Sequence, residues 1–486
     1  MKQILSYKKR FSILLLAAGI TSATLIVSCE KYLDVPIESQ LPSDYTKELT
    51  PDEAFQYVSA AYGGMRKWGV SVFPYIGMFE VTSDDADKGS TADDSPTMLE
   101  LDKFQFDANN DLIASYWNDH YSVISTCNYA ITTLKKLKFT DTTARDQMVA
   151  EAKFIRAFMF LRMNIAYGGV PVVDTLQTVE GFATVARSTK EQVFAFIEKD
   201  LSEAIPFLPE AYSSDQVGRA TNWAAKALLA RTYMFEEKWP ELKLITDEII
   251  GLGPFSLYPN YYRLFRIEGE SSFESVFEIQ NSSMNQGKYR CEYAFVQGPR
   301  NNFAQMQGWG FCVPSQKLVD FFTSRGDNIR KAATVLPRGF RTAEGDSINA
   351  GCPNPYYNFK AYTPKKYNTV DYGLDQNIRY IRYAEVLLMN AEAALHAGGD
   401  AATPFNEVRK RAGLTELGSP TLQDVWDERR AEFAMEEFRF FDLVRTGQAT
   451  AELGSLGYIN GKNNLFPIPQ TQIDLSNGVL LQNPGY

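Results

Sequence analysis

The stretch EAKFIRAFMFLRMNIAYGGVP, residues 151–171, decides the fold class. Its apolar residues recur at intervals of three and four, which predicts an amphipathic helix. Gly168 and Gly169 followed by Pro171 end this helix, because glycine accepts a left-handed cap and proline cannot continue the helical hydrogen bonding. One face of the helix carries Ala152, Ile155, Phe158, Met159 and Arg162. A mainly helical protein is therefore expected.

Helical signals recur on both sides of this stretch. Thr50 before Pro51 is an N-cap followed by a first-turn proline, and Ser188 with Glu191 has the spacing of a capping box. Small residues at 224–227 allow close helix packing of the tetratricopeptide kind, although no clean period of about 34 residues is present. We expect further helices over these ranges: 51–65, 116–134, 188–201, 218–235, 378–397, 403–408 and 422–444.

Between residues 241 and 375 the periodicity fades, and Gly, Pro, Asn and Tyr become more frequent. Only FESVFEIQ, residues 273–280, has the alternation of a strand. Irregular chain of this length inside a compact domain usually carries function. We therefore expect ligand-contacting residues here.

The N-terminus has the layout of an export signal. Four basic residues, Lys2, Lys8, Lys9 and Arg10, precede an interrupted apolar segment over 11–27. LIVSC, residues 25–29, resembles the bacterial lipobox, in which the cysteine is lipidated and becomes the first residue of the mature chain. We expect residues 1–28 to be a lipoprotein signal peptide and Cys29 to carry lipid. A retained anchor or an ordinary signal peptide is the alternative.

Charge and cysteine content exclude several classes of function. Removal of four basic residues with the signal changes the net charge from −10 to about −14, which disfavours binding to nucleic acid. Cys127, Cys291, Cys312 and Cys352 lack the spacing of a zinc site, and the chain has only two histidines. We expect these four cysteines to be buried thiols, with disulfides as the alternative.

Six segments, in order from Cys29 to Tyr486, resemble the SusD/RagB outer-membrane lipoproteins of the Bacteroidetes. They are CEKYLDVP, EAKFIRAFMFLRMNIAYGGVPVV, GRATNWAAKALLARTYMF, IRYAEVLLMNAEAAL with FNEVRKRAGL, ERRAEFAMEEFRFFDLVRTG, and LFPIPQTQIDLSNGVLLQNPGY. Two departures are small. Gln472 and Asp474 stand where glutamate is usual in the family, and Glu30 alone follows Cys29 where surface-exported relatives often carry several acids.

The resemblance implies a mainly α fold: four tetratricopeptide-like helix pairs as a scaffold, and a large irregular lobe with a few short strands. Residues 29–486 would be a single SusD-like domain, comprising an N-terminal helical part (29–240), a loop-rich ligand lobe (241–375) and C-terminal helices with a tail (376–486). The implied function is non-catalytic. A lipid-anchored protein facing the cell exterior would capture oligosaccharide or polysaccharide and deliver it to a SusC-like TonB-dependent transporter in the outer membrane.

The candidate ligand residues are aromatic and polar side chains in irregular chain. A sugar ring has an apolar face and hydroxyl edges, so its site needs a flat aromatic platform with fixed polar partners. One region contains Trp68 and Tyr75. The other contains Tyr293, Arg300, Asn301, Phe303 and Trp309. Because Trp309 lies between Gly308 and Gly310, we expect an exposed ring on a loop.

Two charged motifs have simpler interpretations. Glu436, Arg439, Asp442 and Arg445 alternate in sign every three residues, which predicts a structural ladder of ion pairs on one helix. Asp84, Asp85 and Asp87 are weak calcium candidates; without the glycine and closing glutamate of a standard loop, they are better explained as solvated acids or helix caps. We therefore expect no cofactor beyond a possible structural calcium.

Two other functions remain open at this stage. RagB-type members of the family deliver peptides, so the same fold and transporter partner could serve a peptide cargo. A surface glycoside hydrolase is the remote alternative, since a carboxylate pair could be hidden among 59 acidic residues. Nothing in the sequence marks such a pair.

Overall fold

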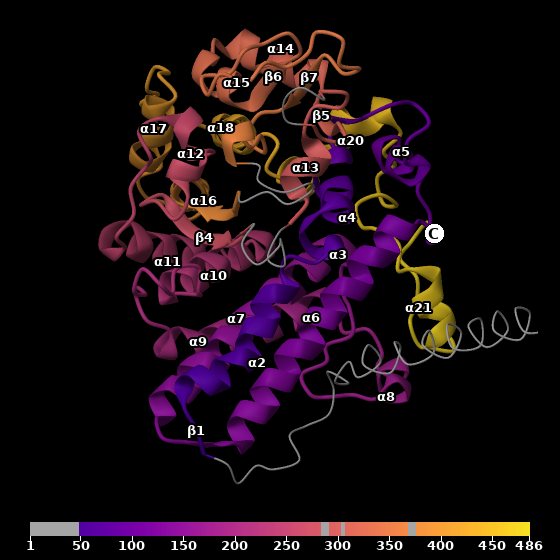
Figure 1. Cartoon of the computed structure of the whole chain (residues 1–486), viewed down its shortest axis with the longest axis vertical. Coiled ribbons are helices and arrows are strands. Elements are labelled where there is room, and N and C mark those ends of the chain that lie inside the picture. The colour runs from indigo at the N-terminus through magenta and orange to yellow at the C-terminus, as the bar shows by residue number, and fades with distance from the viewer. Residues whose placement is uncertain (1–47, 283–290, 303–306, 368–375) are drawn as a thin grey trace, which may run out of the picture. The chain divides into compact units, whose positions relative to one another are not determined.

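The computed structural model describes residues 48–282, 291–302, 307–367 and 376–486. Within residues 48–486, which form one unit, long helices pack beside one another, and most of them occupy the lower and central part of Figure 1. They are α2 (Pro51–Gly64), α6 (Asp111–Lys136), α7 (Thr142–Tyr167), α9 (Lys190–Ala204), α10 (Asn222–Glu236), α11 (Trp239–Leu252), α16 (Tyr383–Ala397), α17 (Ala402–Arg411) and α18 (Leu422–Phe433). This confirms the predicted mainly helical fold.

Local sequence signals set most helix ends. Thr50 caps α2 through a capping box with Glu53, and Gly168 ends α7 with a φ of 73°. The capping box of α9, however, is formed by Thr189 and Gln192, one residue later than predicted. The backbone N–H of Ser188 donates to the Val170 carbonyl at 3.1 Å, so Ser188 still belongs to the preceding connection.

Two predicted helices are divided in the structure. Residues 378–382 form strand β8 (Ile378–Arg382), which pairs antiparallel with β4 (Ser275–Ile279), before α16 begins. The expected helix over 422–444 consists of α18 and α19 (Arg439–Arg445), separated by a turn in which Met435 and Glu437 have positive φ. The backbone N–H groups of both residues donate to the buried Glu80 carboxylate, at 3.2 and 2.6 Å, which stabilises the turn.

The division of the second helix also corrects the predicted ladder of charges. Asp442 and Arg445 form the expected pair three residues apart, at 2.7 Å. Glu436 lies in the turn and pairs instead with Lys360 and Arg382, while Arg439 pairs with Asp84. The motif is structural, as predicted, but its ion pairs join distant parts of the chain.

Short elements make up the upper part of Figure 1. They are α12 (Tyr261–Leu264), α13 (Tyr293–Gln297), β5 (Phe311–Pro314), α14 (Gln316–Arg325), α15 (Asn328–Thr334), β6 (Val335–Pro337) and β7 (Tyr356–Asn358). Strand β5 pairs antiparallel with β2 (Ala86–Gly89), so it lies beside α3 (Trp68–Ser71) and α4 (Phe73–Ile76) near the N-terminal helices. The described strands are short, as expected for the irregular lobe.

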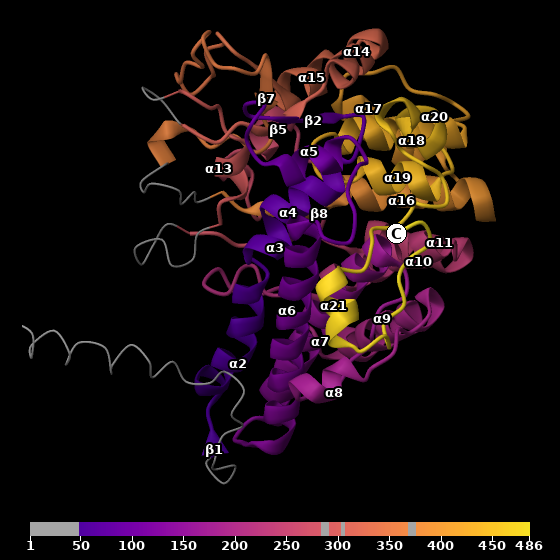
Figure 2. The same cartoon turned by 90° about the vertical axis from the view of Figure 1, so that its right-hand side faces the viewer.

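The C-terminal tail returns to the end of helix α7. Helix α21 (Gln470–Leu475) lies beside α6 in Figure 2, and the Gln472 amide donates to Asn118 of α6 at 3.0 Å. The Phe466 N–H donates to the Ala166 carbonyl at 2.8 Å, and the Asn483 amide donates to the Tyr167 carbonyl at 2.9 Å. Arg187 donates to Leu481 and Asn483. The tail therefore supplies partners for the last carbonyls of α7.

Buried ion pairs join the C-terminal helices to the irregular lobe. Glu432 accepts from Arg382 at 2.8 Å, from Arg330 at 3.4 Å and from Arg411, and Arg382 also pairs with Glu274 at 2.7 Å. All five side chains are at least 96% buried. Because several cations share each carboxylate, this network is a major determinant of how these segments pack.

The four cysteines are free thiols and all are buried, as expected. Burial raises the pKa of Cys127 and of Cys291 to about 12, so both are protonated at neutral pH. Among the described residues, no helix combines the length and the apolar character needed to span a bilayer.

Candidate functional site

Five aromatic residues from three separate segments form one cluster, which we call the aromatic cluster: Trp68, Phe73, Phe295, Trp309 and Phe311. The Trp68 and Phe73 rings stack with centroids 5.5 Å apart, and Trp309 meets Trp68 edge-on at 6.0 Å. Trp309 also contacts Phe295 at 5.8 Å. The two tryptophans that the sequence analysis placed in different candidate regions are therefore neighbours.

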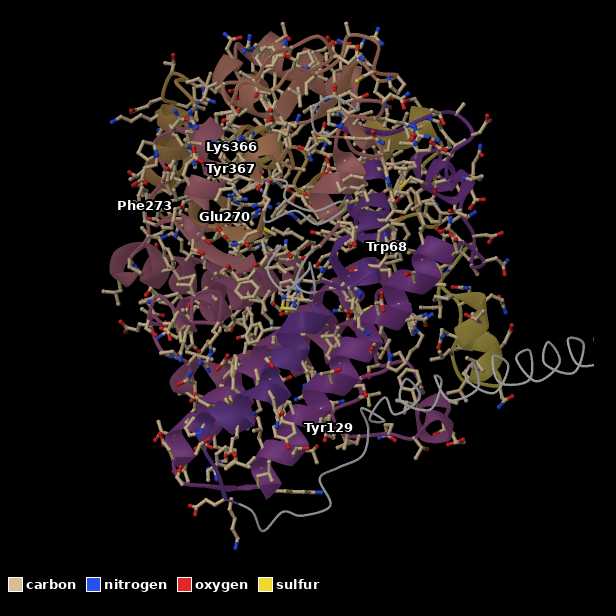
Figure 3. The ribbon with its side chains drawn as sticks, in the orientation of Figure 1. Trp68, Tyr129, Glu270, Phe273, Lys366 and Tyr367 are labelled. Carbon is tan, nitrogen blue, oxygen red and sulfur yellow. The ribbon has the colours of Figure 1, made fainter. Side chains whose placement is uncertain are left out.

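Trp68 is the exposed member of the aromatic cluster, with 37% of its surface accessible, and it is visible in Figure 3 beside α3. It is the first residue of α3, whose Gly69 N–H donates to Asp119 of α6 at 2.8 Å. A Cβ on Gly69 would lie 2.4 Å from the Ser115 carbonyl, so only glycine permits this approach. The position of the Trp68 ring is thus fixed by the packing of α3 on α6.

Trp309 is half-buried, which corrects the expectation of an exposed loop ring. Its flanking glycines serve the backbone. A Cβ on Gly308 would lie 2.5 Å from Gly298, and Gly310 has a φ of 76°. The Trp309 N–H donates to the Phe295 carbonyl at 3.1 Å, which holds the ring against α13.

The neighbouring polar candidates have different environments. Arg300 is half-buried and pairs with Asp94 at 2.8 Å and with the Ser90 hydroxyl at 3.0 Å. Asn301 is exposed and has a φ of 61°. Phe303 lies outside the described residues. Arg300 thus carries a structural pairing in addition to any contact with ligand.

Tyr75 is 95% buried, so it does not offer a platform at the surface. Its ring lies 3.8 Å from the Arg162 guanidinium, and burial raises its pKa. Tyr293 is half-buried, and its hydroxyl donates to Glu437 at 2.7 Å. Both tyrosines point toward the interior beneath the aromatic cluster, because buried charged groups there engage them.

Two polar side chains beside Trp68 escaped the sequence analysis. Lys67 is exposed and donates to the Ser122 hydroxyl at 2.6 Å, with Asp119 3.8 Å away. Lys67 directly precedes Trp68 in the sequence, so its position beside the ring could have been inferred from the sequence. Asp119 reaches the site only through the packing of α3 on α6. Together they place a cation and a carboxylate next to the exposed ring.

The weak calcium candidates are otherwise engaged. Asp84 pairs with Arg439 at 2.7 Å and Lys317 at 2.8 Å, and Asp85 pairs with Arg430 at 2.6 Å. Although burial opposes it, Arg439 and Arg430 hold the pKa of Asp84 below its usual range. Asp84 and Asp85 are therefore neither solvated acids nor suitable calcium ligands, since guanidinium and ammonium groups occupy their oxygens.

Asp87 is exposed and lies in β2, where its backbone pairs with Val313 of β5. Among the described residues, no group of three or more His, Cys, Asp and Glu side chains has the arrangement of a metal site. A calcium ion at these aspartates is not supported.

Glu437 gives a testable pH dependence. Its carboxyl is buried, and burial raises its pKa to about 8. Because the unfolded value is about 4.3, this group stabilises the fold below pH 4 and loses that contribution as the pH rises toward 8. The glutamine of Glu437→Gln stays neutral at every pH. Relative to wild type, we expect this variant to gain about 4 kcal/mol of stability between pH 5 and pH 8.5 in urea unfolding.

The exposed Glu241→Gln is the matched control and should leave the slope unchanged. A Glu437→Gln variant whose stability falls with pH as steeply as the wild type would contradict a protonated Glu437. Glu80 and Asp85, whose pKa values burial also raises, would then be candidate sources of the slope.

The helical scaffold, the irregular lobe and the aromatic cluster with its exposed Trp68 are the arrangement to be compared with known proteins. Two family descriptions match the chain: "SusD family" over residues 337–486 and "Starch-binding associating with outer membrane" over residues 31–234. The chain belongs to the SusD/RagB family, as its sequence motifs predicted. Proteins of this family are binding proteins without catalytic activity, so this membership also confirms the prediction that the chain is not an enzyme.

Individual relatives are similar over nearly the whole chain. SusD-like protein P2 from Formosa agariphila is 24% identical over 99% of both chains. A solved structure described as a laminarin binding SusD-like protein is 28% identical, with a TM-score of 0.81 over 91% of this chain and 100% of that one. Surface glycan-binding protein A from Bacteroides thetaiotaomicron is 25% identical, with a TM-score of 0.78 over 90% of this chain and 99% of that one. The fold is therefore shared along the full length of these structures.

Proposed function

We propose that this chain is a surface glycan-binding lipoprotein of the outer membrane, and that it captures oligosaccharide or polysaccharide for a SusC-like TonB-dependent transporter. The observation that carries the proposal is the exposed indole of Trp68, backed by Phe73 and Trp309. The apolar face of a sugar ring stacks on such a surface, and a rigid backing lowers the entropic cost of binding.

Polar groups around this ring suit hydroxyl recognition. Lys67 and Asp119 lie at one side of Trp68, and Asn301 is exposed on the loop that leads from α13. Sugar hydroxyls donate to carboxylates and accept from ammonium or amide groups, so these side chains supply both kinds of partner. The descriptions of two similar structures, one as laminarin binding and one as glycan-binding, support a glycan as the cargo.

The proposed location in the outer membrane rests on the N-terminal segment and on the family description. Residues 1–28 would be removed, and Cys29, which lies outside the described residues, would hold the lipid. Several acyl chains on one residue give stable anchoring. The matching description that names the outer membrane supports this location. We further propose that residues 29–486 form one domain, in which residues 241–375 are the ligand lobe. We also propose that the anchored protein faces the cell exterior.

The proposal is tested with the lipid-free protein, residues 30–486, by calorimetric titration against laminarin, starch, and plant, host and microbial glycans. We expect saturable binding of at least one glycan and no new reducing ends after prolonged incubation. A parallel titration with peptide mixtures separates the two cargo classes. Binding of peptides alone would replace glycan by peptide as cargo, and robust release of reducing ends would establish a hydrolase.

A further inference from the structure

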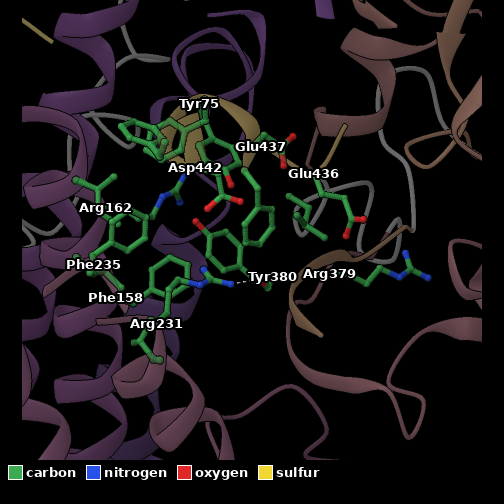
Figure 4. A pocket seen from close by; sticks show the side chains of 17 residues that line it. Tyr75, Phe158, Arg162, Arg231, Phe235, Arg379, Tyr380, Glu436, Glu437 and Asp442 are labelled. Atoms are coloured by element: carbon green, nitrogen blue, oxygen red, sulfur yellow. Dashed lines mark hydrogen bonds between the residues drawn. The ribbon is translucent and has the colours of Figure 1, made fainter. Parts of the chain in front are cut away.

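We propose that this protein holds a small monovalent anion, such as chloride, in an internal cavity beside Arg162. The cavity has a volume of about 50 Å³ and is shown in Figure 4. Its walls come from α4, α7, α10, β8 and α19, so it lies where the helical scaffold meets the C-terminal helices. This site is distinct from the exposed aromatic surface proposed for glycan.

Arg162 lines this cavity, and the Tyr116 hydroxyl is the one described polar group that interacts with its guanidinium. Its side chain is 97% buried, and none of its three guanidinium nitrogens makes a hydrogen bond of good geometry with any described residue. Its charge faces aromatic rings: Tyr75 at 3.8 Å, Tyr380 at 5.2 Å, Phe79 at 5.5 Å, and Tyr116 and Phe158 at 5.6 Å. Figure 4 shows Arg162 among Tyr75, Phe158 and Tyr380. Ring contacts offset part of the cost of burying a guanidinium, but they satisfy none of its N–H groups.

The acids that line the cavity are neutralised by other groups. Glu436 accepts from Lys360 at 2.7 Å and from Arg382 at 2.8 Å. Asp442 accepts from Arg445 at 2.7 Å and from Arg429 at 3.0 Å.

Glu437 accepts from the Tyr293 hydroxyl, and its raised pKa of about 8 keeps it protonated at neutral pH. It therefore supplies no fixed negative charge at pH 7.

The other cations of the cavity wall have their own partners. Arg231 is paired with Glu385 at 2.7 Å and donates to the Tyr380 carbonyl at 2.8 Å. Arg379 donates to the Arg266 carbonyl at 2.7 Å and lies 3.8 Å from Glu270. Arg162 is thus the one charged side chain lining this cavity that lacks a compensating hydrogen bond among the described residues.

Size and chemistry select the anion. A cavity of about 50 Å³ is large enough for a halide. The Tyr116 hydroxyl beside Arg162 is also buried; it interacts with the guanidinium as an acceptor, which leaves its O–H as a second available donor. A dianion such as sulfate or phosphate needs more donors than these two groups provide, whereas a halide is satisfied by a guanidinium and a hydroxyl.

The direct test is crystallography with bromide. Crystals of the lipid-free wild-type protein grown in sodium bromide should show an anomalous peak within hydrogen-bonding reach of the Arg162 guanidinium. In solution, the Tm in 0.1 M sodium chloride should exceed that in sodium gluconate of equal ionic strength by about 2 °C, because a ligand that binds the folded state stabilises it.

Two arginine variants complete the test. Arg162→Met should remove both the bromide peak and the chloride-dependent Tm shift. Arg156→Met is the matched control: on the same helix but outside the cavity, it breaks the buried ion pair with Asp200 and lowers the Tm, but it should retain the chloride shift. A wild-type density map with no anomalous peak at Arg162, or a chloride shift that survives in Arg162→Met, would overturn the proposal. The wild-type map decides the question even if Arg162→Met fails to fold.

Discussion

Replacing Trp68 and Trp309 together by alanine is expected to reduce glycan affinity by about 100-fold or more, because the variant removes both the stacking surface and its support. Trp68 presents its ring to solvent, and Trp309 meets it edge-on at 6.0 Å. Each single variant should lose part of the affinity. Trp68→Ala removes the ring on which the sugar stacks, whereas Trp309→Ala leaves the Trp68 ring free to change its orientation. Calorimetric titration with the best ligand of the glycan screen measures all three.

The structure also predicts the cost in stability. Trp309 packs on Phe295 and Phe73, so its replacement by alanine should cost about 3 kcal/mol, whereas the more exposed Trp68 should cost about 1 kcal/mol. Titrations are therefore run well below the Tm of the double variant. Phe207→Ala, at an exposed site outside the aromatic cluster, is the control and should bind normally. Unaltered affinity in the folded double variant would place the glycan site elsewhere.

Glu432→Gln is expected to cost about 3–5 kcal/mol of stability at pH 7, because it leaves buried cations without their shared carboxylate. Burial alone would raise the pKa of Glu432, but Arg411, Arg382 and Arg330 outweigh it and lower that pKa to about 2. The folded pKa is thus below the unfolded value of about 4.3. The wild-type protein should lose this contribution as the pH falls from 4 to 2, and urea unfolding at pH 7, 4 and 3 measures it.

A matched control comes from the ion pair between Lys226 and Glu248, in which Glu248 is 43% exposed. Glu248→Gln should cost less than about 1 kcal/mol, because solvent screens such pairs. Equal losses in the two Glu→Gln variants would mean that the Glu432 network contributes nothing beyond an ordinary surface pair.

Local sequence patterns predicted most of the helical scaffold. The residues that decide helix α7, its apolar face and the Gly168 end, lie within a few positions of one another, so one segment contains the information. Strand β8 was missed because a short apolar run has no distinguishing period, and its partner β4 lies about a hundred residues away in the chain. The break between α18 and α19 was missed because neither glycine nor proline marks it; the Glu80 carboxylate stabilises it from a distant helix.

The candidate site could be predicted only in part. Trp68 and Trp309 were identified from their surroundings in sequence, but their contact depends on how α3, α13 and β5 pack. Asp84 and Asp85 were interpreted as solvated acids or calcium ligands because their arginine partners lie about 350 residues later. Arg162 stood out only as a charged residue on an apolar helix face, and its surrounding rings come from several elements. Spacing along the chain does not determine such contacts.

The return of the C-terminal tail to helix α7 determines when the protein can finish folding. The Asn483 side chain and the Tyr167 carbonyl are 316 positions apart, yet their hydrogen bond completes the end of a core helix. Contacts of such sequence separation form late, since a long loop must close before they stabilise anything. The last residues must therefore be present before the central helix has all its partners. In the export that we propose, the end of helix α7 therefore acquires its last partners only after residues 466–483 have followed it across the membrane.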